Sequence, residues 1–170
     1  VVMAPVVVNL SDDDGDGETT LSDTPDIIFS SYNLDGAGCC NADSYIRVVS
    51  GDCGTDGDMH TLATIDAVNV DNSGGLAVGD LDGDGVSEII AILNSGGHPQ
   101  GLVALQRLQP DASEWGVMWT NPDIPRWNRH TRGGGAPSIA EINGDGTPDV
   151  VVGNAVVSGV DGATLWDGQE

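Results

Sequence analysis

The sequence predicts an all-β chain in which one structural unit occurs three times, and three observations lead to this prediction. The 170 residues contain 25 glycines and many valines and isoleucines, but few runs that favour a helix. An acidic loop motif recurs, and each copy is followed by an acid that opens a strand, at Asp26, Glu88 and Asp149. These acids are 62 and 61 residues apart, and a fixed period of this size indicates stacked supersecondary units.

Each unit has room for four short strands separated by Gly, Pro, Asn and Asp. In the first unit, apolar β runs cover 5–10 and 26–29. The strands expected in the other two units are 75–81, 88–94, 101–107 and 115–120, then 137–142, 149–154, 155–159 and 163–166. Four-stranded antiparallel sheets repeated in sequence are the blades of a β-propeller. We therefore expect three blades in a single structural domain, at 1–70, 71–135 and 136–170.

The stretch 80–88 predicts a calcium loop. Carboxylates stand at positions 1, 3, 5 and 9 of the motif, as Asp80, Asp82, Asp84 and Glu88. Gathering four like charges is unfavourable without a hard cation, and oxygen ligands without His or Cys favour Ca²⁺. Gly83 and Gly85 supply the tight turn, and the main-chain carbonyl of Val86 is a further expected ligand. The alternative is a polar turn between two strands, which the regular spacing disfavours.

The segments 76–91 (LAVGDLDGDGVSEIIA) and 137–152 (PSIAEINGDGTPDVVV) resemble FG-GAP/VCBS repeats, the integrin-α-type propeller blades found widely in secreted bacterial proteins. The resemblance covers nearly the whole chain. It implies metal ligands at Asp80, Asp82, Asp84, the Val86 carbonyl and Glu88 in the second unit. In the third unit it implies Glu141, Asn143, Asp145, the Thr147 carbonyl and Asp149. The third loop departs from the pattern with Glu at position 1 and Asn at position 3, so its smaller charge should weaken binding.

The first unit departs further, because Asn9 to Asp26 spans 18 residues where the other units have 9. Within this insertion, residues 12–23 match the 12-residue EF-hand register, with Asp in place of Glu at position 12. No amphipathic helix precedes the run, so we expect an EF-hand-like loop on a strand; an acidic surface loop is the alternative. The candidate ligands are Asp12, Asp14, Asp16, Glu18, Asp23 and Asp26, and the expected total is two to three Ca²⁺ ions.

Three cysteines, Cys39, Cys40 and Cys53, lie in a Gly-, Asn- and Asp-rich connection. A disulfide linking Cys53 to Cys40 or Cys39 across a hairpin would leave one thiol over. One alternative is a zinc site formed by the three cysteines with His60, but no Cys-x-x-Cys spacing supports zinc. The other alternative is that the thiols are free.

The segment 124–135 carries a basic and aromatic cluster: Arg126, Trp127, Arg129, His130 and Arg132. On so acidic a chain, this cluster could recognise a carboxylate or a sugar acid, with Trp127 as a stacking platform. The alternative, which we favour, is that the arginines pair with acids of a neighbouring blade.

The net charge of −22 disfavours nucleic acid and anionic membranes as partners. No apolar run approaches the ~20 residues of a membrane span, and the chain begins at Val1 without a signal peptide, so we expect a mature or trimmed product. Loops of this kind suit extracellular calcium near millimolar levels. We therefore expect a secreted or cell-surface chain.

The sequence offers no nucleophile–base set, so we expect a module with a structural, adhesive or ligand-binding role rather than an enzyme. Its ligand would be a carbohydrate or a protein. One alternative is a subunit of an extracellular filament or surface layer. Another is the catalytic or non-catalytic propeller portion of a polysaccharide lyase.

Three blades are fewer than the four to eight with which propellers typically close. Exposed edges and apolar faces invite association. We therefore expect this chain to be a piece of a larger propeller or assembly, in which the partners are other blades of a longer chain or further copies of itself.

Overall fold

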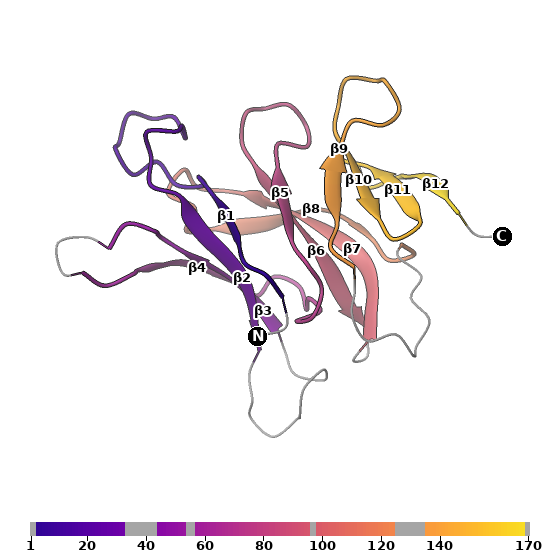
Figure 1. Ribbon diagram of the computed structural model, residues 1–170, viewed down its shortest axis with the longest axis horizontal. Coiled ribbons are helices and arrows are strands. Elements are labelled where there is room, and N and C mark those ends of the chain that lie inside the picture. The colour runs from indigo at the N-terminus through magenta and orange to yellow at the C-terminus, as the bar shows by residue number, and fades with distance from the viewer. Residues whose placement is uncertain (1–2, 33–43, 54–56, 96–97, 125–134, 169–170) are drawn as a thin grey trace.

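The computed structural model describes residues 3–32, 44–53, 57–95, 98–124 and 135–168. These residues form twelve strands and no helix, which confirms the all-β prediction (Figure 1). The strands are β1 (Val6–Val8), β2 (Asp26–Tyr32), β3 (Ser44–Val49), β4 (Thr61–Ile65), β5 (Ala77–Gly79), β6 (Glu88–Ser95), β7 (His98–Arg107), β8 (Trp115–Asn121), β9 (Ser138–Ala140), β10 (Asp149–Val152), β11 (Ala155–Ser158) and β12 (Thr164–Asp167).

The strands form three separate four-stranded antiparallel sheets, one for each repeat of the sequence. In every sheet the strands are hydrogen-bonded in chain order: β1 to β4, β5 to β8 and β9 to β12. The first strand of each sheet is only three residues long, shorter than the 75–81 and 137–142 expected from sequence. The first strand of each sheet ends early because the chain enters an acidic loop. In that loop, side chains accept hydrogen bonds from main-chain amides of the loop itself.

The three sheets share one register. A row of four residues crosses each sheet, and a β-bulge follows the third member of the row in all three cases. The rows are Val6–Ile28–Val48–Ala63, Ala77–Ile90–Ala104–Trp119 and Ser138–Val151–Val156–Trp166. The repeat identified from the acidic loops therefore extends to the register of strand pairing and to the position of the β-bulge.

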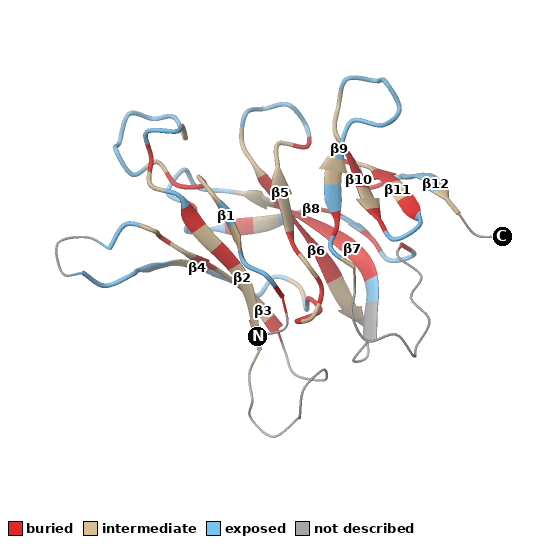
Figure 2. Cartoon of the chain, in the orientation of Figure 1, coloured by how far each residue is buried: buried red, intermediate tan, exposed pale blue. Residues whose placement is uncertain are grey.

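Apolar side chains are buried in two clusters, one between the first and second sheets and one between the second and third. The middle strand β6 alternates between them: Ile89 and Ala91 belong to the first cluster, and Ile90 and Ile92 to the second. Figure 2 shows this buried band running through the middle of the chain, with the loops exposed. A strand covered on both faces explains why its sequence is apolar on both sides of the pleat.

Trp119 on β8 anchors the second sheet to the third. Its indole Nε1 donates a hydrogen bond to the carbonyl of Gly159 at 2.6 Å. Gly162 has a φ of +70°, and a Cβ there would lie 2.5 Å from the indole ring. Only glycine combines this backbone conformation with so close an approach.

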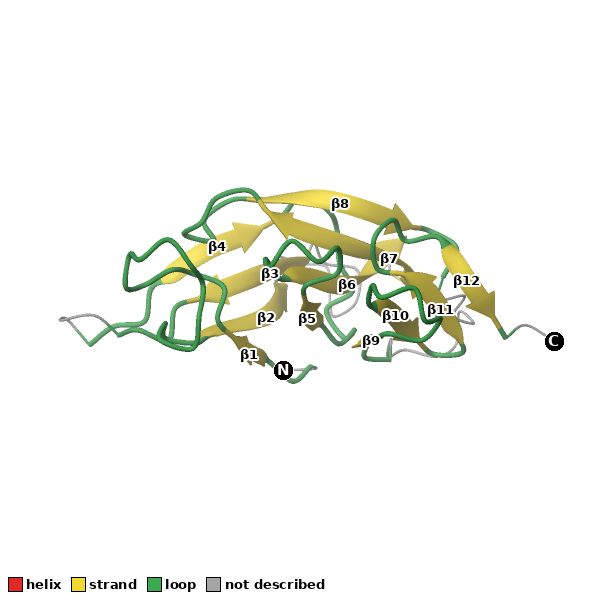
Figure 3. Ribbon diagram, turned by 90° about the horizontal axis from the view of Figure 1, so that it is seen from above, coloured by secondary structure: helices red, strands yellow, loops and turns green. Residues whose placement is uncertain are grey.

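Seen from above, the three sheets form an arc (Figure 3). The first strands β1, β5 and β9 lie next to one another along the concave side, while β4, β8 and β12 spread along the convex side. The three acidic loops that follow the first strands all lie at the same edge of the molecule (Figure 1).

Candidate metal centre

The second acidic loop is closed by its own carboxylates. The side chain of Asp80 accepts hydrogen bonds from the amides of Gly83 and Gly85, at 2.7 and 2.9 Å. Asp82 accepts from the amide of Asp84, and Asp84 accepts from the amide of Val86 at 2.7 Å. The two glycines have φ values of +81° and +86°, which side chains disfavour, so the alternation of acid and glycine is required by this turn.

Three carboxylates meet at the neck of this loop. Asp80, Asp82 and Glu88 each offer an oxygen, and these oxygens lie within 4.8 Å of one another. Glu88 is buried, and its Oε2 accepts a hydrogen bond from the amide of Leu81 at 2.8 Å. Burial raises the pKa of Glu88 to about 7; the Leu81 hydrogen bond opposes this rise and the neighbouring aspartate charges add to it. A divalent cation would offset the cost of burying the Glu88 charge and the repulsion between Glu88 and the neighbouring aspartates.

The remaining predicted ligands of the second loop are Asp84 and Val86. The carboxylate of Asp84 is exposed and lies outside the group of three converging oxygens. An open depression beside the loop is lined by Asp84, Val86 and Glu88 on one side and by residues 106–110 on the other. Solvent therefore reaches the loop at this position.

The inserted first loop builds the same turn. Asp12 accepts hydrogen bonds from the amides of Gly15 and Gly17 at 2.7 and 2.9 Å, the distances found at Asp80. Asp14 and Asp16 accept from amides two residues further on, as Asp82 and Asp84 do. Oxygens of Asp12, Asp14 and Asp16 lie within 4.8 Å of one another. Residues 12–18 are thus the structural equivalent of 80–86, a relationship that the EF-hand register alone did not identify.

Two acids in the first unit hold different parts of the chain, and Asp26 makes the hydrogen bond that Glu88 makes in the second unit. Asp23 holds the loop, because its carboxylate accepts hydrogen bonds from the amides of Asp13 at 2.9 Å and Thr20 at 2.6 Å. Asp26 instead holds the end of β1, accepting from the amides of Leu10 and Ser11 at 2.8 and 2.9 Å. The hydrogen bond from Thr20 lowers the pKa of Asp23, while burial raises the pKa of Asp26. The ligand roles of Glu18, Asp23 and Asp26 stay predictions.

The third loop repeats the turn with different side chains. Glu141 accepts from the amide of Gly144 at 2.6 Å, and Asn143 accepts from the amide of Asp145 at 2.8 Å. The amide group of Asn143 also donates to Asp145 at 2.8 Å, and hydrogen bonds led by that from the Thr147 hydroxyl lower the pKa of Asp145. Among the described residues, the acids of this loop do not form a third group of converging oxygens.

In the third loop, Asp149 is the acid whose surroundings favour a cation. It is 1% exposed, and its Oδ2 accepts a hydrogen bond from the amide of Ile142 at 3.0 Å. Its Oδ1 is buried without any hydrogen-bond partner. A buried carboxylate oxygen without a partner is unfavourable, so the residues present fit a bound cation at this loop.

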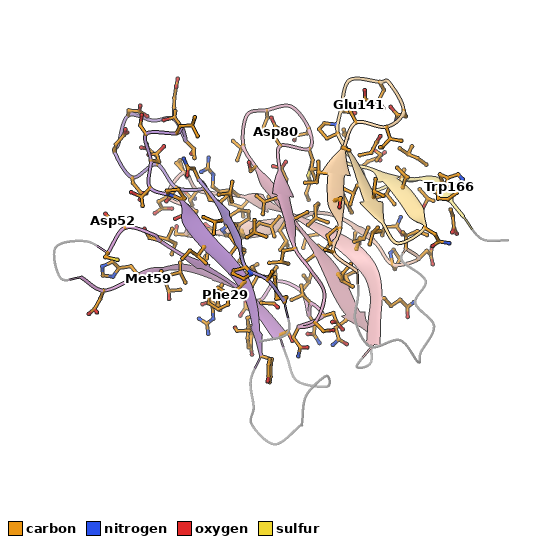
Figure 4. The ribbon with its side chains drawn as sticks, viewed as in Figure 1. Phe29, Asp52, Met59, Asp80, Glu141 and Trp166 are labelled. Carbon is orange, nitrogen blue, oxygen red and sulfur yellow. The ribbon has the colours of Figure 1, made fainter. Side chains whose placement is uncertain are left out.

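Asp80 and Glu141, which open the second and third loops, lie at the same edge of the molecule (Figure 4), and Figure 1 shows the first loop at that edge as well. Arg107 links the first loop to the second sheet: its guanidinium donates to the Leu10 carbonyl and to the Thr19 hydroxyl, the latter at 3.1 Å. Sequence reasoning missed this link, because the two partners are almost a hundred residues apart along the chain.

Two sets of predicted residues lie outside the described part of the chain. One is the basic cluster of Arg126, Trp127, Arg129, His130 and Arg132; the other is the pair Cys39 and Cys40. Cys53 is described, and it lies exposed after β3 with its Sγ 3.9 Å from the Gly51 carbonyl. The disulfide and the ligand patch therefore stay predictions.

No known protein-family model matches the chain, and no curated protein matches its sequence. Among solved structures, the chain is similar to rhamnogalacturonan lyase YesW, with a TM-score of 0.56 and 16% identity over 96% of this chain and 30% of that one. It also matches the V. cholerae biofilm matrix protein Bap1, with a TM-score of 0.45 and 25% identity over 99% of this chain and 31% of that one. The chain spans less than a third of either structure. The likeness to YesW shows a shared fold.

The described residues contain no helix that could span a membrane.

Proposed function

We propose that the chain is a calcium-binding extracellular module of the FG-GAP/VCBS β-propeller type, with a structural, adhesive or ligand-binding role. The observation that carries the calcium proposal is the meeting of the buried Glu88 carboxylate with Asp80 and Asp82. A carboxylate with a pKa of about 7 among other acids is a poor arrangement for the metal-free chain and a good one for a hard divalent cation.

The residues that would hold the ion differ between the loops. In the second loop they are Asp80, Asp82 and Glu88, with Asp84 and the Val86 carbonyl as further candidates. In the first loop they are Asp12, Asp14 and Asp16, with Asp23 at the neck. In the third loop Asp149 would contribute its unpartnered Oδ1. Bound Ca²⁺ would offset most of the negative charge of these acids and thereby hold each loop against the sheet from which it arises.

The arrangement of the sheets supports the propeller assignment. The first strands lie close together and the fourth strands spread apart, as in a sector of a radial array of blades (Figure 3). The extracellular assignment follows from the metal. Exposed loops that bind calcium weakly fill at extracellular levels near millimolar and stay empty at cytosolic levels.

Isothermal titration with Ca²⁺ tests the metal proposal. The chain should bind two to three ions, and Glu88→Gln should remove or weaken one of them. The matched control is Glu114→Gln, because Glu114 is an exposed glutamate outside the three loops. Absence of calcium binding, or an equal loss in both variants, would refute the proposal.

A second candidate function is the propeller portion of a polysaccharide lyase. The observation that favours it is the fold shared with rhamnogalacturonan lyase YesW over 96% of this chain. Incubating the chain with rhamnogalacturonan and Ca²⁺, followed by chromatography of released oligosaccharides, tests this function. Unchanged polysaccharide would exclude catalysis by these 170 residues.

A further inference from the structure

The third sheet repeats, on its outer face, the surface that the first two sheets bury against their neighbours. This outer face is the side turned away from the second sheet, with the row Ser138, Val151, Val156 and Trp166. The corresponding rows of the first two sheets are buried in the two apolar clusters. Trp119 is 7% exposed in the second sheet, whereas Trp166, at the same register and after the same bulge, is 56% exposed.

An apolar position at the start of each acidic loop shows the same difference in exposure. Leu10, Leu81 and Ile142 each stand two residues after the first strand of a sheet, and the amide of each bonds the acid that opens the second strand. Leu10 and Leu81 are buried against the next sheet. Ile142 is 56% exposed. Since the backbone contacts match, the difference is the absence of a sheet over Ile142 among the described residues.

The outer face of the first sheet is the complementary surface. In the second and third sheets, the residues that receive the preceding sheet include Ile89 and Leu105, and Val150 and Val157, all buried. By register, their equivalents in the first sheet are Ile27 and Val49. Both are half-buried, and the adjoining Val7 on β1 is 62% exposed.

Gly51 marks where a tryptophan would dock on this first sheet. Its equivalent in the third sheet is Gly159, whose carbonyl accepts the indole N–H of Trp119. Both glycines stand two residues after the paired valine of the third strand. Both also press against the carbonyl of the proline before the strand-opening acid, at Pro25 and Pro148, where a Cβ would lie 2.2 Å from the oxygen.

We propose that a second copy of this chain packs the outer face of its first sheet onto the outer face of the third sheet. Trp166 then takes the place of Trp119, with its indole N–H donating to the Gly51 carbonyl of the second copy, and Ile142 takes the place of Leu81. The contact continues the two inter-sheet interfaces within the chain. Such head-to-tail contacts close a ring of two copies or extend into a filament.

Because the chain is acidic, the strength of the contact should depend on the salt concentration. Two chains that each carry a charge of −22 repel one another, and salt screens that repulsion. Apolar burial of the tryptophan and isoleucine is insensitive to this screening. Self-association should therefore strengthen as the salt concentration rises. The proposal rests on the repeated sheets and not on bound calcium.

Light scattering coupled to size-exclusion chromatography tests the contact. The native chain should show a mass above 17.4 kDa that rises with concentration. Trp166→Ser and Ile142→Asp should each return it to the monomer mass, and Trp166→Phe, which loses the single N–H donor, should weaken association roughly fivefold. The matched control is Leu108→Asp, which should associate like the native chain, because Leu108 is an exposed leucine in the turn between β7 and β8.

A mixing experiment separates this contact from non-specific aggregation. Ile142→Asp damages only the third sheet and Val7→Asp only the first, so each variant alone should be monomeric. Mixed together, they retain one native interface and should form a heterodimer. A native chain that stays monomeric at every concentration, or variants that remain monomeric when mixed, would overturn the proposal. Calcium titration reports on the metal loops separately, so failure of one proposal is distinguishable from failure of the other.

Discussion

The buried carboxylate of Glu88 accepts a hydrogen bond from the amide of Leu81 at 2.8 Å, and this contact joins the calcium loop to the core. The same residue, Glu88, meets Asp80 and Asp82 at the neck of the loop, while the side chain of Leu81 is buried between the second and third sheets. A change in the charge of the loop should therefore affect the packing of the second sheet against the third.

Removing calcium should loosen or unfold the chain, because it leaves buried and crowded carboxylates without a counter-charge. Ligand binding stabilises a fold by about 2.7 kcal/mol per site at a free concentration of 100 times Kd. Thermal melts with chelator, then with Ca²⁺ or Mg²⁺ restored, measure the effect. Mg²⁺ should restore stability poorly, since it demands a tighter octahedral site. An unchanged midpoint after chelation would contradict the calcium assignment.

Asp82→Ala and Asp84→Ala should each weaken calcium binding and destabilise the chain more than Asn143→Ala. Asp82 is one of the three converging carboxylates of the second loop, and Asp84 holds that loop through the amide of Val86. Asn143 carries no charge, and its amide group donates a hydrogen bond to Asp145. Titration calorimetry on the three variants, with melts in Ca²⁺, provides the comparison. Equal losses at both loops would show that charge count does not rank the sites.

The metal-free chain should lose stability as the pH rises from about 4.5 to about 7. The pKa of Glu88 is about 7 in the folded chain and near its ordinary 4.5 when unfolded, so the folded state binds the extra proton in this window. Raising the pH removes that proton and the stability it supplies. Urea unfolding across this pH range, with chelator, should show a slope that Glu88→Gln reduces. With saturating Ca²⁺ the slope should flatten or reverse; a native slope equal to that of Glu88→Gln would disprove the assignment.

Trp119→Ala should destabilise the monomer by about 3–5 kcal/mol, as for other buried aromatic residues. It removes the indole packed on Gly162 and the hydrogen bond to Gly159. Trp166→Ala, at the equivalent position, should cost the monomer only about 0.5 kcal/mol, the usual range for an exposed site. Denaturant unfolding at dilutions that favour the monomer tests the pair. Similar costs would mean that the two positions are not equivalent.

Asp23→Ala should weaken calcium binding at the first loop, because Asp23 holds the loop through the amides of Asp13 and Thr20. Asp26→Ala should chiefly lower the stability of the chain, because Asp26 is buried and holds the end of β1. Calorimetric titration and melting of both variants distinguish the two roles. A larger loss of calcium affinity in Asp26→Ala would reverse the assignment.

The sequence by itself determined the repeating sheets and the loops that join their first two strands. Alternating acids and glycines at 80–85 and 141–146 permit few backbone paths, since the glycines must reach positive φ and each acid can bond an amide two or three residues on. The run 89–92 is apolar on both sides of the pleat, which is typical of a strand covered on both faces. These features depend on local sequence, so they could be predicted locally.

Only the tertiary structure decided which acid serves which contact and which apolar residues are covered. The spacing of Asp23 and Asp26 is compatible with either acid at the neck of the inserted loop, because it does not fix which amide each carboxylate reaches. Trp119 and Trp166 occupy the same register, yet one is buried and the other exposed. Burial depends on whether another sheet lies against the face, and that is a property of sheet packing rather than of the residues along a strand.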